Sequence, residues 1–182
     1  PRTQRNQLIS AFSGWGFTWK GLLNNKKGEW WLFGQIILIA VHLSPRWPSH
    51  ESLAIYWPPS LFVFGTLVFL IGIIRATRAF LSLGASLSPL PEPKAGAILI
   101  TEEAYSHCRH PLYQALIISS LGIFFAKGSL LHLFLLIALC VLLRGKAKRE
   151  EEKLKELHFN YISYLSETPA IVKGLPFLDW RG

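Results

Sequence analysis

Four uncharged apolar stretches constrain the fold of this chain more than any other feature of its sequence. They cover residues 30–43, 55–74, 111–126 and 129–143, and none contains Asp, Glu, Lys or Arg. A helix needs about 20 apolar residues to cross a bilayer, within a range of about 17–25. The second stretch reaches that length, whereas the other three are shorter and also fit the buried core helices of a soluble protein. Because all four occur in one chain of 182 residues, we expect an all-α membrane protein with about four transmembrane helices.

The basic residues are distributed unevenly around these stretches. Only Arg46 lies between the first two and only Lys127 between the last two, so the other 17 of the 19 Lys and Arg residues lie elsewhere. The positive-inside rule then places both termini and the 75–110 connection on the cytoplasmic side of a multi-pass protein. We therefore attribute the net charge of +8 to membrane orientation and expect no nucleic-acid partner. Lys127 and Gly128 leave room only for a tight turn, so the last two stretches should form a hairpin.

Composition limits the remaining possibilities. The two cysteines are too few for a disulfide framework, and nothing has the spacing of a metal site, so we expect no metal. The sequence contains no methionine, from which we expect that the native start lies before Pro1. The length predicts a single domain, 1–182, in which residues 1–29 form an N-terminal arm.

The entry into the third apolar stretch carries polar residues. Pro111 suits the first turn of a helix, and His110 before it is biased to an extended conformation. The free N–H groups and positive dipole of that helix end would favour an anion at the interface, beside Tyr113. The preceding connection, 81–110, is long, and loops of such length are usually functional or disordered. Residues 97–100 of this connection are apolar enough to pack against other residues, which argues against disorder.

A charged stretch follows the fourth apolar segment. In it Glu150, Glu151, Leu154 and Leu157 fall at helical spacing, so we expect a separate helix that starts near Glu150. The hairpin would bring this helix to the side of His110, where carboxylates could hold hydroxyls or an ammonium group. A solvated helix with intrahelical Lys–Glu pairs is the alternative.

These features occur in an order that resembles a known family. The sequence LITEEAYSHCRHPLY, followed after the hairpin by KAKREEEKLKELHFNYISYLSETPAIVKGLP, resembles the isoprenylcysteine carboxyl methyltransferases, which are integral membrane enzymes that use S-adenosylmethionine. The lead-in LGASLSPLPEPK is similar to that of bacterial members. The resemblance covers residues 81–176 and consists of RHPxY, a glutamate pair, and YxxY with a closing proline.

The resemblance implies roles for individual residues. The cofactor's adenosine would contact 97–100, and its methionine end the HPxY group, with Tyr105 a further contact. Glu150 would be the acidic cofactor ligand with Glu151 beside it. Arg109 is the motif arginine, and Lys146 stands where eukaryotic members have an acceptor-side arginine, so these two are the predicted catalytic residues. The predicted cofactor-binding residues are Ala97, Ile98, Leu99, Ile100, Tyr105, His110, Pro111, Leu112, Tyr113, Glu150 and Glu151.

The chain departs from the family pattern at two places. Glu103 and Ala104 occupy the positions where a glycine and a proline or small residue are usual, which changes the turn leading to Tyr105. His158 and Phe159 replace the usual Phe-Gly before the YxxY motif, which reshapes the lid of the site.

The chemistry agrees with the resemblance. Methyl transfer from a sulfonium needs an in-line approach and a dry pocket, and the faces of Tyr105 and Tyr113 could favour the sulfonium. A carboxylate acceptor needs no general base, and Arg109 or Lys146 could hold it. We expect a lipophilic acceptor, such as a prenylcysteine carboxylate, and membrane lipids as partners. A phospholipid or amine methyltransferase, a membrane reductase or isomerase of similar pattern, and a non-catalytic membrane subunit remain alternatives.

Overall fold

The computed structural model describes residues 24, 25, 27–83, 88, 90, 91 and 98–181. Within these residues the chain forms five α-helices and one 3-10 helix, and it forms no strand. The elements are α3 (Glu29–Val41), α4 (Pro59–Leu83), the 3-10 helix η2 (Glu103–Ser106), α5 (Pro111–Lys127), α6 (Leu130–Leu157) and α7 (Tyr161–Glu167). The all-α fold class is thus confirmed for the described part of the chain.

The helix boundaries follow the apolar stretches in part. Helices α3 and α5 nearly coincide with the predicted segments 30–43 and 111–126. Helix α4 begins at Pro59 and continues to Leu83, nine residues past the predicted end at 74. The expectation of a separate helix starting near Glu150 is wrong, because α6 is one helix of 28 residues. No proline interrupts it, so the apolar and charged segments form one continuous helix.

Two helices in the described chain are long and apolar enough to cross a membrane. These are α4 and α6, while α3 and α5 are apolar but shorter, with 13 and 17 residues. Helix α4 exposes many apolar side chains, among them Phe62, Val63, Leu67, Leu70, Ile71 and Ile74. Such a surface is typical of a helix that faces lipid rather than water. Four crossings remain a prediction.

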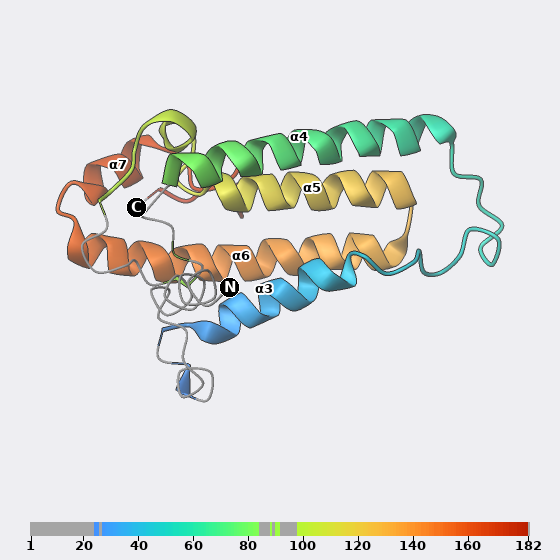
Figure 1. The fold of residues 1–182 in the computed structure, drawn as a ribbon, viewed down its shortest axis with the longest axis horizontal. Helices are drawn as coiled ribbons and strands as arrows, with labels where there is room; N and C mark the ends of the chain where they lie inside the picture. The colour runs from blue at the N-terminus through green and yellow to red at the C-terminus, as the bar shows by residue number, and fades with distance from the viewer. Residues whose placement is uncertain (1–23, 26, 84–87, 89, 92–97, 182) are drawn as a thin grey trace, which may run out of the picture.

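The helices pack lengthwise (Figure 1). Helix α4 lies along α5, and α6 returns beside α5 after the turn at Gly128, whose φ of 55° is left-handed. This confirms the predicted hairpin. The α4–α5 pair is very close, since a Cβ on Gly65 would lie 2.5 Å from the carbonyl oxygen of Gly122. Small residues allow such close approach of membrane helices.

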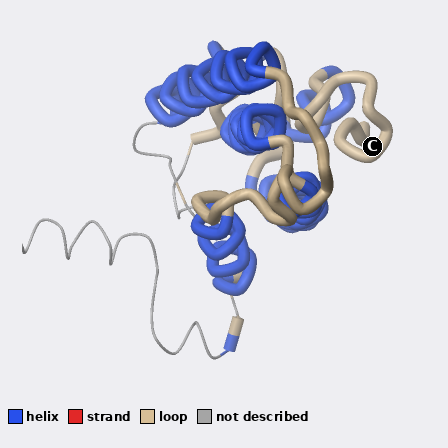
Figure 2. The backbone as a smooth tube through the Cα atoms, turned by 90° about the vertical axis from the view of Figure 1, so that its right-hand side faces the viewer, coloured by secondary structure: helices blue, strands red, loops and turns tan. Residues whose placement is uncertain are grey.

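Helix α3 packs on α6 through another glycine. A Cβ on Gly145 would lie 2.3 Å from the Trp31 ring, so only glycine fits at this crossing. Figure 2, which views the helices end-on, shows α3 on the far side of the bundle from α4. This arrangement brings α3 against residues 144–157 of α6, the half of that helix that carries its charged residues.

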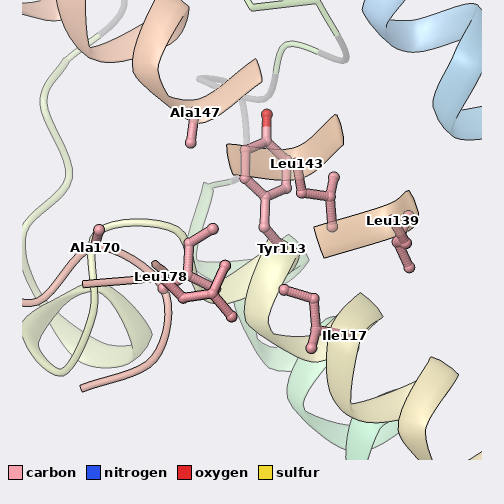
Figure 3. Close-up of a cluster of buried hydrophobic side chains, with 8 residues drawn as sticks. Tyr113, Ile117, Leu139, Leu143, Ala147, Ala170 and Leu178 are labelled. Carbon is pink, nitrogen blue, oxygen red and sulfur yellow. The ribbon is translucent and has the colours of Figure 1, made fainter. Parts of the chain in front are cut away.

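A compact core joins α5, α6 and the segment that follows α7, residues 168–181, which we call the C-terminal segment. Figure 3 shows Tyr113 and Ile117 of α5 facing Leu139, Leu143 and Ala147 of α6. The cluster is completed by Ala170, Ile171 and Leu178. The C-terminal segment is therefore packed into the fold next to the start of α5.

Polar side chains hold the helices together at the end of the bundle where the α5–α6 turn lies. A hydrogen bond of 2.6 Å joins His42 Nε2 and Ser120 Oγ, and Lys127 Nζ donates to the carbonyl of His42. The Ser129 hydroxyl donates to the carbonyl of Trp47. These contacts fix α3 against the α5–α6 turn.

Candidate active site

The turn that precedes α5 is held by the C-terminal segment. The Arg109 N–H donates to the carbonyl of Pro169 over 2.9 Å, and the His110 N–H donates to that of Ala170 over 3.0 Å. His110 has a non-helical backbone and Pro111 begins α5, as the His-Pro pair predicts. The position of the RHPxY turn therefore depends on residues near the end of the chain.

A cavity of about 280 Å³ lies between this turn and the charged half of α6. Eight of the predicted cofactor-binding residues line it: Ile98, Leu99, Ile100, Tyr105, His110, Leu112, Tyr113 and Glu150. Both predicted catalytic residues, Arg109 and Lys146, line it as well. The structure thus brings together predicted site residues that are up to 52 positions apart in the chain, since the lining includes both Ile98 and Glu150.

Tyr113 and Glu150 join the two helices across this cavity. The Tyr113 hydroxyl donates to Oε2 of Glu150 over 2.9 Å. The Tyr113 ring stacks on His110, with centroids 5.3 Å apart and planes only 4° from parallel. The Glu150 side chain keeps 27% of its surface exposed, so its carboxylate can accept further hydrogen bonds from a ligand.

Glu151 has a different environment from Glu150. It is 3% exposed and is not among the described residues that line the cavity, so the structure does not bring this predicted cofactor contact to the cavity. Its Oε1 accepts from Arg109 Nε over 2.8 Å and lies 2.9 Å from His110 Nε2. Its Oε2 accepts from the Trp180 indole over 2.6 Å. Glu151 therefore fixes the wall of the cavity from behind.

Arg109 is also committed to the wall. Arg109 is 3% exposed, and its guanidinium donates to Glu151 and to the carbonyls of Leu165, Thr168 and Trp180. An arginine that already holds a carboxylate and three carbonyls has little capacity left for a substrate. These contacts favour a positioning role for Arg109, and its predicted contact with the acceptor stays a prediction.

Lys146 points toward α3. Its Nζ donates to Gln35 Oε1 over 2.7 Å and lies 5.3 Å from the centre of the Tyr113 ring. Lys146 itself is buried. A buried ammonium group beside a cavity favours an anionic ligand group there.

Besides Glu151, two further predicted residues are not part of the cavity as described. Pro111 begins α5 but does not line this cavity. Ala97 lies outside the described residues. The rest of the predicted adenosine wall, Ile98 to Ile100, does line it.

The departure at Glu103 has a clear structural consequence. Its φ is 52°, in the left-handed region that favours glycine, and glycine is the residue that the family pattern has at this place. Its carboxylate accepts from the Ser82 hydroxyl over 2.7 Å, which ties η2 to α4. Glu103 thus adopts a backbone conformation that glycine favours, and its side chain makes a contact that a glycine cannot make.

Several lining residues were missed by sequence reasoning. Leu32 and Gln35 of α3 and Phe80 and Leu83 of α4 line the cavity, and no local signal marks them, since only helix packing brings them there. Tyr161 and Tyr164 also line it. Their signal is the YxxY spacing, which carries the family resemblance but does not by itself place the two tyrosines at the cavity.

The tyrosines around the cavity are neutral phenols. Burial, aided by the charge of Glu150, raises the pKa of Tyr105 far above its usual value. Burial and then the charge of Glu151 do the same to the pKa of Tyr161. Burial raises the pKa of the Cys108 thiol to about 11, although Arg75 opposes the change. Cys108 is therefore a packing residue rather than a nucleophile.

One polar atom in the wall lacks a partner. Tyr161 is 1% exposed, and its hydroxyl has no hydrogen-bond partner in the described part of the chain. In contrast, the Tyr164 hydroxyl donates to the carbonyl of Tyr105 over 2.5 Å. A buried hydroxyl without a partner is unfavourable and needs an explanation. A ligand in the cavity that Tyr161 lines would supply one.

Comparison with known proteins identifies the family. The phospholipid methyltransferase family model matches residues 60–160, more than half of the chain. The isoprenylcysteine carboxyl methyltransferases belong to this same family. A search of curated proteins gave no match. Together with the two long apolar helices, the family indicates a membrane-bound methyltransferase. The chain belongs to the phospholipid methyltransferase family.

Proposed function

We propose that the protein transfers a methyl group from S-adenosylmethionine to a lipophilic acceptor at the membrane interface. The observation that carries this proposal is the convergence of the RHPxY turn and Glu150 on one cavity of about 280 Å³. The acceptor that fits best is a carboxylate of the prenylcysteine type. The RHPxY turn leads into α5 and Glu150 lies on α6, so the two meet only in the folded chain.

The residues present suit S-adenosylmethionine. When bound, this cofactor supplies an electrophilic methyl group on a sulfonium. The unpartnered Tyr161 hydroxyl and the half-buried Glu150 carboxylate offer polar contacts for it. The apolar residues 98–100 and Leu112 would hold its adenosine and methionine parts, and the Tyr105 and Tyr113 rings would favour its positive charge.

The chain's own residues orient and shield the reactants. The Glu151–Arg109 pair fixes His110, which stacks on Tyr113 and so fixes the Tyr113–Glu150 hydrogen bond. The apolar lining excludes water, which strengthens electrostatic contacts inside the cavity. Lys146 would hold the anionic group of the acceptor, and a carboxylate is already a nucleophile at neutral pH, so no base is required.

A phospholipid with an amine headgroup is the second candidate acceptor. The description of the matching family favours it. An amine must lose a proton before it attacks, and Glu150 is the only carboxylate among the described residues lining the cavity. A carboxylate acceptor would therefore need the positive charge of Lys146, whereas an amine acceptor would need Glu150 to accept its proton.

We further propose that the protein is a single domain, 1–182, embedded as a multi-pass protein with membrane lipids as its neighbours. The cavity lies at the end of the bundle where α6 carries Lys146, Lys148 and Arg149, while Arg46 and Lys127 lie at the other end. The positive-inside rule then puts the cavity and both termini on the cytoplasmic side. Region 81–176 would bind the water-soluble cofactor from there.

Tyr161→Phe is expected to weaken S-adenosylmethionine binding about fivefold, the loss typical of one neutral hydrogen bond. Removing a hydroxyl that has no protein partner should not lower the melting temperature. Titration calorimetry on the purified protein measures the affinity, with Tyr56→Phe as the control, since Tyr56 is exposed on a distant loop. Unchanged affinity in Tyr161→Phe would show that the hydroxyl does not meet the cofactor.

Lys146→Gln is expected to raise the KM for a prenylcysteine carboxylate about tenfold or more, because it removes a charge-assisted contact. The assay follows labelled methyl from S-adenosylmethionine into N-acetyl-S-farnesylcysteine and into phosphatidylethanolamine. A base-labile product identifies an ester. Lys155→Gln, an exposed lysine of the same helix, is the control. Transfer to phosphatidylethanolamine alone, unaffected by Lys146→Gln, would replace the carboxylate with the amine acceptor.

A further inference from the structure

A second cavity, of about 660 Å³, lies between the end of α4 and η2. Among the described residues, it shares no lining residue with the first cavity. Three side chains with basic nitrogen atoms line it, Arg75, Arg78 and His107. Nothing in the proposed methyl transfer uses these residues.

The two arginines are arranged to meet an anion. They lie three residues apart on α4 and therefore on one face of the helix. Arg75 Nη2 donates to Gln114 Oε1, and Gln114 Nε2 donates in turn to the carbonyl of Ile171 over 2.6 Å, so Arg75 is held in place. The Arg78 guanidinium has no hydrogen-bond or ion-pair partner in the described ranges, and its donors are free for a ligand.

The acidic content of this cavity is low. Glu103 is the one acidic residue among its described lining residues, and its Oε2 already accepts from the Ser82 hydroxyl over 2.7 Å. His107 is engaged by the Ser106 hydroxyl over 2.8 Å through Nδ1. Two guanidinium groups against one carboxylate leave an excess of positive charge. One guanidinium group can donate two parallel hydrogen bonds to two oxygens of the same phosphate, in a well-defined geometry.

The place of the cavity along α4 indicates where the anion comes from. The uncharged part of α4 ends at Ile74, directly before Arg75, and its apolar side chains point outward. Leu81, which is exposed, adds an apolar rim to the cavity. Phosphate groups of lipids lie at the boundary where the apolar part of a spanning helix ends.

We propose that this second cavity binds the phosphate group of an anionic membrane phospholipid through Arg75 and Arg78. The acyl chains would lie along the exposed apolar surface of α4. The shared chemistry is a phosphate oxyanion, which free phosphate also offers, and the position at the end of an apolar helix favours the lipid as the source. The site is separate from the cofactor cavity and does not depend on methyl transfer.

Native mass spectrometry of the full chain, released from micelles doped with phosphatidylglycerol, tests this site. The wild-type protein should retain the lipid, whereas it should not retain diacylglycerol, which lacks the phosphate. Arg78→Ala should lower retention about tenfold, since one charge-assisted contact is lost. Arg46→Ala removes the same charge from the exposed loop at the other end and should retain as much lipid as the wild-type protein.

Equal losses in Arg78→Ala and Arg46→Ala would overturn the proposal, because net charge alone would then explain binding. Retention of diacylglycerol would overturn it as well. Displacement of the lipid by equimolar inorganic phosphate would assign the site to the free anion instead. Arg78 is exposed, so circular dichroism of Arg78→Ala should match that of the wild-type protein and keep each of these outcomes interpretable.

Discussion

Glu151→Ala is expected to destabilise the folded protein by about 3–5 kcal/mol, the cost typical of removing one partner from a buried ion pair. The substitution leaves the Arg109 guanidinium buried without its carboxylate. It also leaves the Trp180 indole and the His110 ring without their acceptor. Thermal unfolding of the purified protein in detergent, followed by tryptophan fluorescence, measures the effect.

Glu152→Ala is the matched control for this prediction. Glu152 is the next residue of the same helix, and it is exposed. A surface substitution of this kind changes stability by about 0.5 kcal/mol or less. If the two variants melted at the same temperature, Glu151 would not organise the wall of the cavity, and the positioning role of Arg109 would be lost with it.

Glu150→Ala is expected to weaken S-adenosylmethionine binding at least about tenfold, because a carboxylate that meets a cation or hydroxyls in a cavity makes strong hydrogen bonds. Its effect on stability should be smaller than that of Glu151→Ala. Glu150 is half-buried, and among the described residues its one hydrogen-bond donor is the Tyr113 hydroxyl, with His110 Nδ1 further away at 3.8 Å. Equilibrium binding of labelled cofactor to the purified variant measures the loss.

Loss of the Tyr113 partner could itself disturb the site, and a double variant separates the two effects. Leaving the buried Tyr113 hydroxyl unpaired costs about 1–3 kcal/mol. Tyr113→Phe removes that hydroxyl, so Glu150→Ala/Tyr113→Phe should recover most of the stability and none of the binding. A double variant that bound the cofactor like the wild-type protein would rule out Glu150 as a ligand.

Local signals in the sequence were sufficient for the hairpin and for one side of the cavity. Pro111 predicts the start of α5, and the Lys127–Gly128 turn predicts an antiparallel return. Together these place Tyr113 and Glu150 at the same end of the bundle, where the structure joins them by a hydrogen bond. Neither step needs information about distant parts of the chain, which is why both could be predicted.

The other side of the cavity depends on long-range packing. Leu32 and Gln35 reach it only because α3 crosses α6 at the contact between Trp31 and Gly145. A tryptophan and a glycine far apart in the sequence carry no pairing signal. The four-span prediction is limited in a related way, since α3, with 13 residues, reaches only about 20 Å at the rise of a helix.

The different roles of Glu150 and Glu151 were equally hidden. Adjacent residues of a helix point about 100° apart, so only one of the two can face the cavity. The choice is decided by the irregular C-terminal segment, which brings the Trp180 indole to Glu151 and the carbonyl of Thr168 to Arg109. Segments without regular structure leave no periodic pattern from which such contacts could be predicted.

The most direct test of the central claim is the binding of S-adenosylmethionine to the purified wild-type protein. Titration calorimetry should give one site per chain, and S-adenosylhomocysteine should compete for it, since the two share every group except the methyl. Arg78→Ala, which alters only the second cavity, should bind the cofactor like the wild-type protein. Absence of saturable binding by folded wild-type protein would contradict the account.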